Sequence, residues 1–508
     1  MNISKLNGLN SLHMNAPIYN KVRSYIRENS ISFHMPGHKM GRSFPHEFIE
    51  EFVKFDITEI TGTDNLHFPD GIIKEAQGLA AKAYGSDKTY FLVNGSSCGI
   101  HASILSVLMP GDRILVLRDC HRSVIGGMML AGANPVYMNT EFDSFFGIST
   151  ILKPGTLEKA LADNADVKAV IITRPNYYGI CSDIRRIAEI THSYGKILIV
   201  DEAHGAHLKF SKTLPVSAIE AGADISIQSA HKTLPAITQG AYLHVKSSMV
   251  DIERIEFYLR LLQTTSPSYI IMTSLDIARE IMECSGEKLL EDLIENTEWI
   301  RHAVNKLESS FVPLKEDMIG EKLIDGSMTG KKLMEGSPTG QELMDKTRLV
   351  FNTRNLGKAG YLVSQILKDK FRIQVEMADM LNIVCICTIS DSRKDFDALY
   401  QALNELSEDN KREVISDGIR IQNIKELPVP KQVINLGDIG KCRGKLVILK
   451  DSVGKASRDF IVPYPPGIPV ICPGEIIMKE TIEYIYKVIE WGGIINGVDE
   501  NFFVDIIE

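Results

Sequence analysis

The most specific chemical signal in the sequence is a lysine and an acid, each placed directly after an apolar run. Lys232 ends the motif SAHK, which follows the run ADISIQ, and Asp201 ends the earlier run ILIVD. Taken alone, the motif SAHK predicts an ordinary surface lysine, because lysine is seldom buried unless it is paired. The acid upstream changes that interpretation, because two apolar runs of this kind predict neighbouring buried strands.

Together, these two residues suit the chemistry of pyridoxal phosphate (PLP). In PLP enzymes a lysine carries the cofactor as a Schiff base, and a carboxylate faces the pyridine nitrogen because the protonated ring is the stronger electron sink. Neighbouring strands would bring Asp201 and Lys232 to the same edge of a sheet. We therefore predict that Lys232 is the cofactor-binding and catalytic lysine and that Asp201 is the partner of the ring nitrogen.

Two histidines follow Asp201 in the motif DEAHGAH, and they leave a second interpretation open. His204 and His207 are spaced i, i+3, a spacing that can ligate zinc on a helix. The glycine between them and the absence of an HExxH order favour PLP chemistry over a metal site. We expect no metal ion here.

A small-residue turn, NGSSCG at residues 94–99, follows another apolar run. Free backbone amides and hydroxyls at a helix N-terminus bind a single phosphate well, although the same turn also suits an ordinary helix cap. It matches neither a Walker loop nor a dinucleotide fingerprint. His121 follows the run ILVL and could stack on an aromatic cofactor, although a lone histidine is more often structural.

The elements that must position these residues alternate between strands and helices. Seven strands are predicted at residues 89–93, 113–117, 134–138, 169–173, 197–201, 225–228 and 240–245. Such alternation predicts an α/β fold with a mainly parallel sheet flanked by helices. Ligands of such sheets bind beyond the carboxyl ends of the strands, where the residues above are placed.

Three regions are predicted along the chain. Residues 1–54 form an N-terminal segment, residues 55–290 a large PLP-binding domain, and residues 291–508 a smaller α+β region. A helix is expected over 286–309, and apolar runs lie at 349–351, 373–377, 383–388 and 445–449. A ten-residue repeat (GEKLIDGSMT, GKKLMEGSPT, GQELMD) begins at Gly320 and predicts an exposed insertion over about 318–345, without a catalytic role.

Composition excludes several classes of protein. A net charge of −9 without a basic block argues against a nucleic-acid partner. The sequence has no secretory leader pattern and no apolar stretch of membrane-spanning length, so no membrane association is expected. The eight cysteines contain no CxxC pair and predict free thiols in a reducing cytoplasm.

The motifs together resemble the bacterial ornithine/lysine/arginine decarboxylases. The matching segments, in family order, are FHMPGHKMG (33–41), DITEITGTDNLHFPDGIIKEAQ (56–77), NGSSCG (94–99), PGDRILVLRDCHRS (110–123), DEAHGAH (201–207), SAHK (229–232) and PYPPGIPVICPGE (463–475). The resemblance implies an aspartate-aminotransferase-like PLP fold. Its length resembles the short branch of the family, whose members are often arginine decarboxylases.

The resemblance also assigns roles to single residues. It implies that Lys232 carries the cofactor, that His204 lies near the ring and its O3′, and that His121 stacks on the ring face. The phosphate would be held by Ser96, Ser97, Ser229 and His231. Asn176, where many members have threonine, would contact the cofactor by a hydrogen bond.

The implied reaction is PLP-dependent decarboxylation of a basic amino acid, with arginine to agmatine and CO2 preferred, as a step of polyamine biosynthesis. Lysine and ornithine stay open as substrates, because Asn65 stands where many members have aspartate and removes one negative charge near the expected substrate entrance. Asp64 and Glu475 are the candidate partners of the substrate's distal cation. Relatives of this fold assemble their active sites at a subunit interface, so at least a homodimer is expected.

Two further functions stay open. One is an aminotransferase or aldolase of the same fold, against which the PYPPGIPVICPGE segment counts. The other is a non-enzymatic protein that kept the fold, against which the intact set of Lys232, Asp201 and His204 counts.

Overall fold

The computed structural model describes residues 16–307, 310–319, 342–413, 424–465 and 467–508. Its centre is a seven-stranded sheet with the order β2 (Lys88–Leu92), β10 (Ala241–Val245), β9 (Ile225–Gln228), β8 (Ile197–Asp201), β7 (Ala169–Thr173), β3 (Arg113–Leu117) and β4 (Asn134–Met138). Every strand runs parallel to the others except β10, which is antiparallel to both of its neighbours. The predicted α/β fold with a mainly parallel sheet is confirmed.

Apolar residues on both faces explain why these strands are buried. In β3, Ile114 and Val116 belong to one core cluster, whereas Leu115 and Leu117 belong to another. Successive side chains of a strand point to opposite faces, so this alternation requires a helical layer on each side. The first cluster contains α4 (Gly95–Val107), α5 (Arg122–Ala131) and α9 (Ile252–Leu262), and the second contains α6 (Pro154–Asp163) and α7 (Ile184–Ser193).

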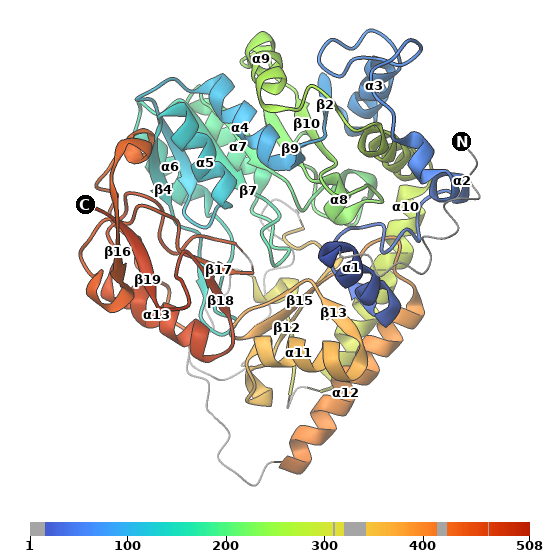
Figure 1. Cartoon of the computed structure of the whole chain (residues 1–508), viewed down its shortest axis with the longest axis vertical. Coiled ribbons are helices and arrows are strands. Elements are labelled where there is room, and N and C mark those ends of the chain that lie inside the picture. The colour runs from blue at the N-terminus through green and yellow to red at the C-terminus, as the bar shows by residue number, and fades with distance from the viewer. Residues whose placement is uncertain (1–15, 308–309, 320–341, 414–423, 466) are drawn as a thin grey trace.

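A second, smaller sheet lies below the first in Figure 1. Its antiparallel order is β11 (Val312–Pro313), β12 (Arg348–Asn352), β15 (Asn382–Ile386) and β14 (Met377–Ala378), and α11 (Gly360–Phe371) and α12 (Arg393–Glu413) accompany it. The helix α10 (Tyr269–Asn305) begins at its Ser268 cap, earlier than the predicted start at residue 286. The predicted boundary at 290/291 therefore falls inside one continuous helix.

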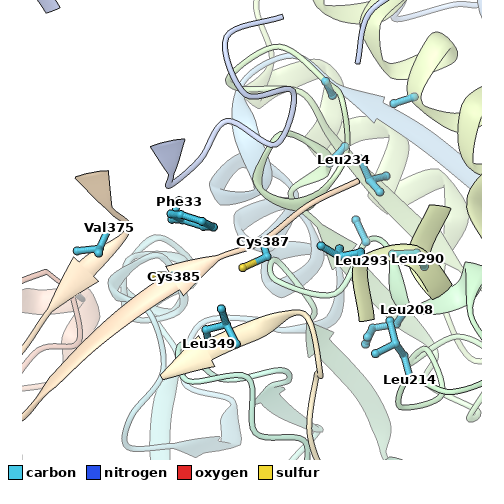
Figure 2. Packing of buried hydrophobic residues seen from close by; sticks show 14 of the residues in the cluster. Phe33, Leu208, Leu214, Leu234, Leu290, Leu293, Leu349, Val375, Cys385 and Cys387 are labelled. Carbon is cyan, nitrogen blue, oxygen red and sulfur yellow. The ribbon is translucent and has the colours of Figure 1, made fainter. Parts of the chain in front are cut away.

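The N-terminal segment is packed against the small sheet region. After α1 (Pro17–Glu28), the strand β1 (Ile31–Phe33) pairs in parallel with β13 (Ile373–Val375). Figure 2 shows Phe33 near Val375 and Cys385, in a core that also contains Leu293 of α10 and Leu208. This pairing holds residues 34 and 35 beside the break between β13 and β14.

The C-terminal residues have an apolar core of their own. They form the antiparallel pairs β16 (Gly444–Ile448) with β19 (Phe503–Ile507) and β17 (Val462–Tyr464) with β18 (Ile494–Asn496), together with α13 (Lys479–Glu490). In Figure 1 these elements lie beside the end of the large sheet that contains β4.

The remaining helices and strands are α2 (His46–Glu50), α3 (Ile72–Tyr84), α8 (Ala230–Thr233), β5 (Phe142–Asp143), β6 (Ile148–Ser149) and the 3-10 helices η3 (Phe52–Phe55), η4 (Leu208–Phe210), η5 (Glu316–Met318), η6 (Arg354–Leu356), η7 (Leu436–Lys441) and η8 (Leu449–Asp451).

Most of the predicted repeat insertion, residues 320–341, lies outside the described residues. Its last copy ends inside the fold, because Met344 and Asp345 are both buried. Within the part of the chain that the structure describes, no helix is long and apolar enough to cross a bilayer.

Candidate active site

Lys232 lies on the short helix α8, directly after β9, at the carboxyl edge of the large sheet. Its side chain borders a cavity of about 650 Å³ that is open to solvent. The walls come from the large sheet, the small sheet region, the N-terminal segment and residues 464–465. The polar and aromatic side chains that line it include Tyr25, His34, Ser96, Ser97, His121, Tyr177, His204, Ser229, His231, Glu376 and Tyr464.

Burial dominates the electrostatics of Lys232 and lowers the pKa of its amine. The negative charges of Asp201 and Glu376 oppose that effect, and Arg348 adds to it. Removal of an ammonium group from water disfavours its charged form. A lysine with a lowered pKa has more of the neutral amine that reacts with a carbonyl group.

Asp201 ends β8, the strand next to the one that leads to Lys232. Its carboxylate is buried and accepts a hydrogen bond from the amide of Ala203 at 3.2 Å. Burial raises the pKa of Asp201, and the charge of Lys232 opposes this effect. The predicted pairing of the acid and the lysine at neighbouring strand ends is thus present in the fold.

A group of hydroxyls and backbone amides forms one corner of the cavity. Ser229 donates a hydrogen bond to the Ser96 hydroxyl at 2.7 Å. The helix α4 starts at Gly95 without a side-chain cap, so its first amides have no capping partner from Asn94. Such a corner has the donors that a phosphate monoester needs.

His231 borders the same corner, with its Nδ1 atom 2.9 Å from the carbonyl oxygen of Gly240. Because a carbonyl oxygen can only accept, Nδ1 carries the hydrogen in this contact. Burial lowers the pKa of His231 to about 4. The neutral ring therefore contributes Nε2 as an acceptor, and the serine hydroxyls and helix amides are the donors of the corner.

His121 caps the N-terminus of α5, because its ring nitrogen accepts a hydrogen bond from the amide of Ser123. The ring also borders the cavity. Burial, and then the charge of Lys232, lower the pKa of His121 to about 3, so the ring is neutral at physiological pH. A neutral planar ring held by a cap suits the predicted stacking role.

His204 contacts Lys232 directly, since its Nε2 lies 3.2 Å from the lysine Nζ. Its other nitrogen, Nδ1, lies 3.0 Å from a guanidinium nitrogen of Arg348. The ring of Tyr177 lies 5.1 Å from the imidazole, centre to centre. Burial, with the nearby cations, lowers the pKa of His204 well below its ordinary value.

The second histidine of the DEAHGAH motif belongs to a different network. His207 Nε2 lies 3.2 Å from an oxygen of Asp345 and 3.1 Å from the Thr347 hydroxyl. Among the described residues, no group of three or more His, Cys, Asp or Glu side chains is arranged to hold a metal ion. The two histidines therefore have separate partners in this structure.

Asn176 has a role in the loop that follows β7. Its side-chain oxygen accepts hydrogen bonds from the amides of Tyr178 and Ile180, each at 3.0 Å, and its amide donates to the carbonyl oxygen of Ser149. It borders a neighbouring cavity but not the one that contains Lys232, whereas Tyr177 borders both. The structure thus brings Tyr177, rather than Asn176, to the predicted cofactor position.

The two acids predicted to bind the substrate side chain are also placed elsewhere. Burial raises the pKa of Asp64, but hydrogen bonds from the amides of residues 65, 70, 71 and 73 outweigh it and lower the pKa overall. Glu475 is fully buried and pairs with Arg118 at 2.9 Å. Neither acid borders the cavity around Lys232.

Two charged residues near Lys232, Glu376 in the cavity wall and Arg348 behind His204, were not predicted from the sequence. Glu376 lies between β13 and β14 and accepts a hydrogen bond from the amide of Met35 at 2.9 Å. Arg348 opens β12 and reaches His204 from the small sheet. Neither residue belongs to a recognisable motif. Both are charged residues within or next to an apolar run, and this is the signal in the sequence that could have identified them.

The described residues fit PLP as a cofactor. They supply an amine with a lowered pKa, a buried carboxylate one strand away, a neutral imidazole and a corner of hydroxyl and amide donors, all at one edge of the sheet. Such a sheet with a lysine beyond its carboxyl edge defines an enzyme of the aspartate-aminotransferase-like fold class.

Comparisons with known proteins agree with this class and narrow it. Residues 16–395 match the major domain of Orn/Lys/Arg decarboxylases, and residues 437–501 match their C-terminal domain. An arginine decarboxylase of Bacillus anthracis is 36% identical over 490 residues, which are 95% of this chain and 95% of that protein. The chain belongs to the Orn/Lys/Arg decarboxylase family and is a decarboxylase.

Solved structures support the fold. A lysine decarboxylase of Francisella novicida superimposes with a TM-score of 0.74 at 20% identity, covering 93% of this chain and 78% of that one. An alanine–glyoxylate aminotransferase from Nostoc sp. superimposes with a TM-score of 0.56 at 14% identity, covering 74% and 95%. The aminotransferase-like architecture predicted from the motifs is confirmed.

Proposed function

We propose that this enzyme decarboxylates L-arginine to agmatine and CO2, with PLP held on Lys232. The observation that carries the proposal is the convergence of Lys232, Asp201 and the serine corner on one sheet edge. The preference for arginine rests on the relative from Bacillus anthracis, which is named an arginine decarboxylase and aligns over 95% of both chains.

When bound, PLP supplies an electron sink for the pair released as the bond between Cα and the carboxylate breaks. Asp201 would hold a proton on the pyridine nitrogen, because its carboxylate is buried and cannot be screened by water. Ser96, Ser97 and Ser229 would hold the phosphate, and the His121 ring would hold the plane of the cofactor. Lys232 would return a proton to Cα after CO2 has left.

We assign the distal cation of the substrate to Glu376. Within the described residues, it is the carboxylate that borders the cavity with Lys232. Its side chain has one hydrogen bond from the amide of Met35, through Oε2. A carboxylate can accept two parallel hydrogen bonds from a guanidinium group, which suits arginine. Tyr464 and Tyr25 border the same cavity and would lie beside the bound side chain.

The test is product analysis with purified, PLP-loaded protein. Arginine, lysine and ornithine are supplied separately, and the CO2 and the amine released are quantified. We expect agmatine from arginine and much slower release from the other two. No CO2 from any of the three would overturn the proposal, and faster turnover of lysine or ornithine would overturn the choice of arginine.

A matched pair of variants tests the assignment of the lysine. Lys232→Ala should lose both the activity and the visible absorbance of the lysine-bound cofactor. The control is Lys209→Ala, whose amine lies at the surface and pairs with Glu220 at 2.9 Å. Full retention of the visible band in Lys232→Ala would contradict the assignment.

We also propose a homodimer that works in the cytoplasm as part of polyamine synthesis. Support for the dimer comes from large apolar side chains exposed on the N-terminal third, including Ile18, Val22, Val53 and Phe68, which are 81%, 51%, 81% and 70% exposed. Exposed apolar groups of this size gather at protein interfaces. Light scattering after size-exclusion chromatography would give the mass, and a stable monomer at micromolar concentration would contradict the dimer.

A further inference from the structure

A row of three side chains connects the small sheet to Lys232. Arg348, at the start of β12, contacts His204 Nδ1 at 3.0 Å, and His204 Nε2 contacts Lys232 Nζ at 3.2 Å. Arg348 is 2% exposed and His204 is 3% exposed. Water therefore has little access to the contact between Arg348 and His204, and the hydrogen positions in this row have chemical consequences.

The chemistry of the three groups leaves one arrangement. Arginine has five N–H donors and no acceptor, so it must donate to His204 Nδ1. A neutral imidazole has one N–H, and its second nitrogen is the acceptor. His204 therefore carries its hydrogen on Nε2 and points it at Lys232. An ammonium group on Lys232 has no lone pair to accept that hydrogen, whereas a neutral amine has one.

We propose that Arg348 is a positioning residue that fixes His204 in the Nε2–H form, so that His204 donates to Lys232 and holds it as a neutral amine. The neutral amine is the form that attacks a carbonyl group. Arg348 thus acts through His204 and touches neither the cofactor nor the substrate. The proposal extends the proposed function, since it concerns how the same lysine is made reactive.

Several contacts hold Arg348 in place for this role. Its own amide donates to the carbonyl oxygen of Asp345 at 3.1 Å, and Arg301 donates to its carbonyl oxygen. The side chain packs against Gly179, which has a φ of +83° and where an added Cβ would lie 2.6 Å from the Cβ of Arg348. The charge of Asp345 stabilises the buried guanidinium. The donor is therefore fixed before any ligand binds.

The first measurement is nitrogen NMR of full-chain, PLP-loaded protein labelled with 15N-histidine. The His204 signals are assigned by their absence from His204→Gln. We expect an unprotonated Nδ1 and a protonated Nε2 in the wild type. Arg348→Met should produce a population with protonated Nδ1 and lower kcat by about 10- to 100-fold, the range seen when the outer partner that orients a metal-ligating histidine is removed. KM should change much less than kcat.

Two further variants separate positioning from a purely structural role. Arg348→Lys keeps an obligate donor and should retain the unprotonated Nδ1 and more of kcat than Arg348→Met. Arg279→Met removes another buried arginine, whose bonds stay on α10 with Asp276 and Glu283. It should leave the His204 signals unchanged.

A protonated Nδ1 in the wild type would overturn the proposal, and this result does not depend on whether any Arg348 variant folds. An unprotonated Nδ1 that persists in Arg348→Met would overturn it as well. Because the tautomer is measured without substrate, failure of the enzyme to decarboxylate arginine would leave this inference standing, and the two failures can be told apart.

Discussion

Replacement of Asp345 by asparagine should destabilise the enzyme by an amount that depends on pH in a defined way. Asp345 is fully buried, and its carboxylate accepts from the Thr347 hydroxyl at 2.7 Å and contacts His207 at 3.2 Å. Burial alone would raise its pKa. Its contacts with His207, Arg348 and Thr347 outweigh burial and lower the pKa of Asp345 to about 2.

The size of the effect follows from that pKa. A decrease in the pKa of Asp345 from its ordinary value of 3.8 to about 2 corresponds to about 2.4 kcal/mol of folding free energy. Because the native pKa lies below the unfolded one, this stability is fully present above about pH 4 and is lost as the pH falls towards 2. Asp345→Asn has no charge to lose, so its deficit should be constant from pH 7 to 5 and shrink below pH 4.

The assay is urea unfolding at a series of pH values, followed by the fluorescence of Trp299 and Trp491. Asp391→Asn is the control, because burial raises the pKa of Asp391 to about 6, against the effect of Lys39. The stability that protonated Asp391 contributes is present below about pH 4 and is lost as the pH rises through 6. Between these pH values, the free energy of unfolding of Asp391→Asn should therefore change with pH at a different slope from that of the wild type. A wild-type midpoint for Asp345→Asn at pH 7, or a deficit at pH 3 as large as the deficit at pH 7, would contradict this account of Asp345.

Three further outcomes are expected. Ser96→Ala removes the acceptor of the Ser229 hydrogen bond and should raise the Kd for PLP about tenfold in a titration of the apoenzyme, whereas an unchanged Kd would exclude a phosphate contact. Glu475→Gln leaves Arg118 without its buried counter-charge and should cost about 3 kcal/mol in urea unfolding; equal midpoints would show that the pair contributes nothing. Gly179→Ala combines a positive φ with a steric overlap and should cost about 2–4 kcal/mol, tested by calorimetry.

The bounds of the strands in the large sheet could be predicted closely because each buried strand consists mostly of consecutive apolar residues. Five of the seven have the predicted bounds, and β2 and β10 differ by a single residue at their ends. A strand that is covered on both faces is apolar along its whole length, so its first and last residues can be recognised in the sequence. The long helix α10 was predicted only from residue 286, because its first half is buried on several sides and lacks a clear amphipathic stripe.

The residues of the candidate site also fall into a group that could be predicted from the sequence and a group that could not. Lys232, Asp201 and His121 follow directly from strand ends, so their convergence could be predicted from the topology of a parallel sheet. Arg348 and Glu376 come from the small sheet region, whose position over the large sheet no local pattern specifies. The sequence analysis named 373–377 only as an apolar run, and in the structure this run is divided at Glu376, whose side chain borders the cavity. Asp64 and Glu475 were chosen by segment, and each has partners within its own surroundings.

The ten-residue repeat shows why similar sequence segments need not have equivalent roles. The three copies contain LID, LME and LMD at corresponding places, so sequence alone treats Asp345 as one of three similar acids. In the structure Met344 is paired with Ile180 by a β-bridge, and Asp345 holds His207 and the backbone of Arg348. What distinguishes the third copy is its position, directly before β12. If the number of repeat copies changes but residues 344–348 keep their spacing, the hydrogen bond from the Arg348 amide to Asp345 is therefore preserved. Insertion or deletion of one residue between Asp345 and Arg348 would remove it.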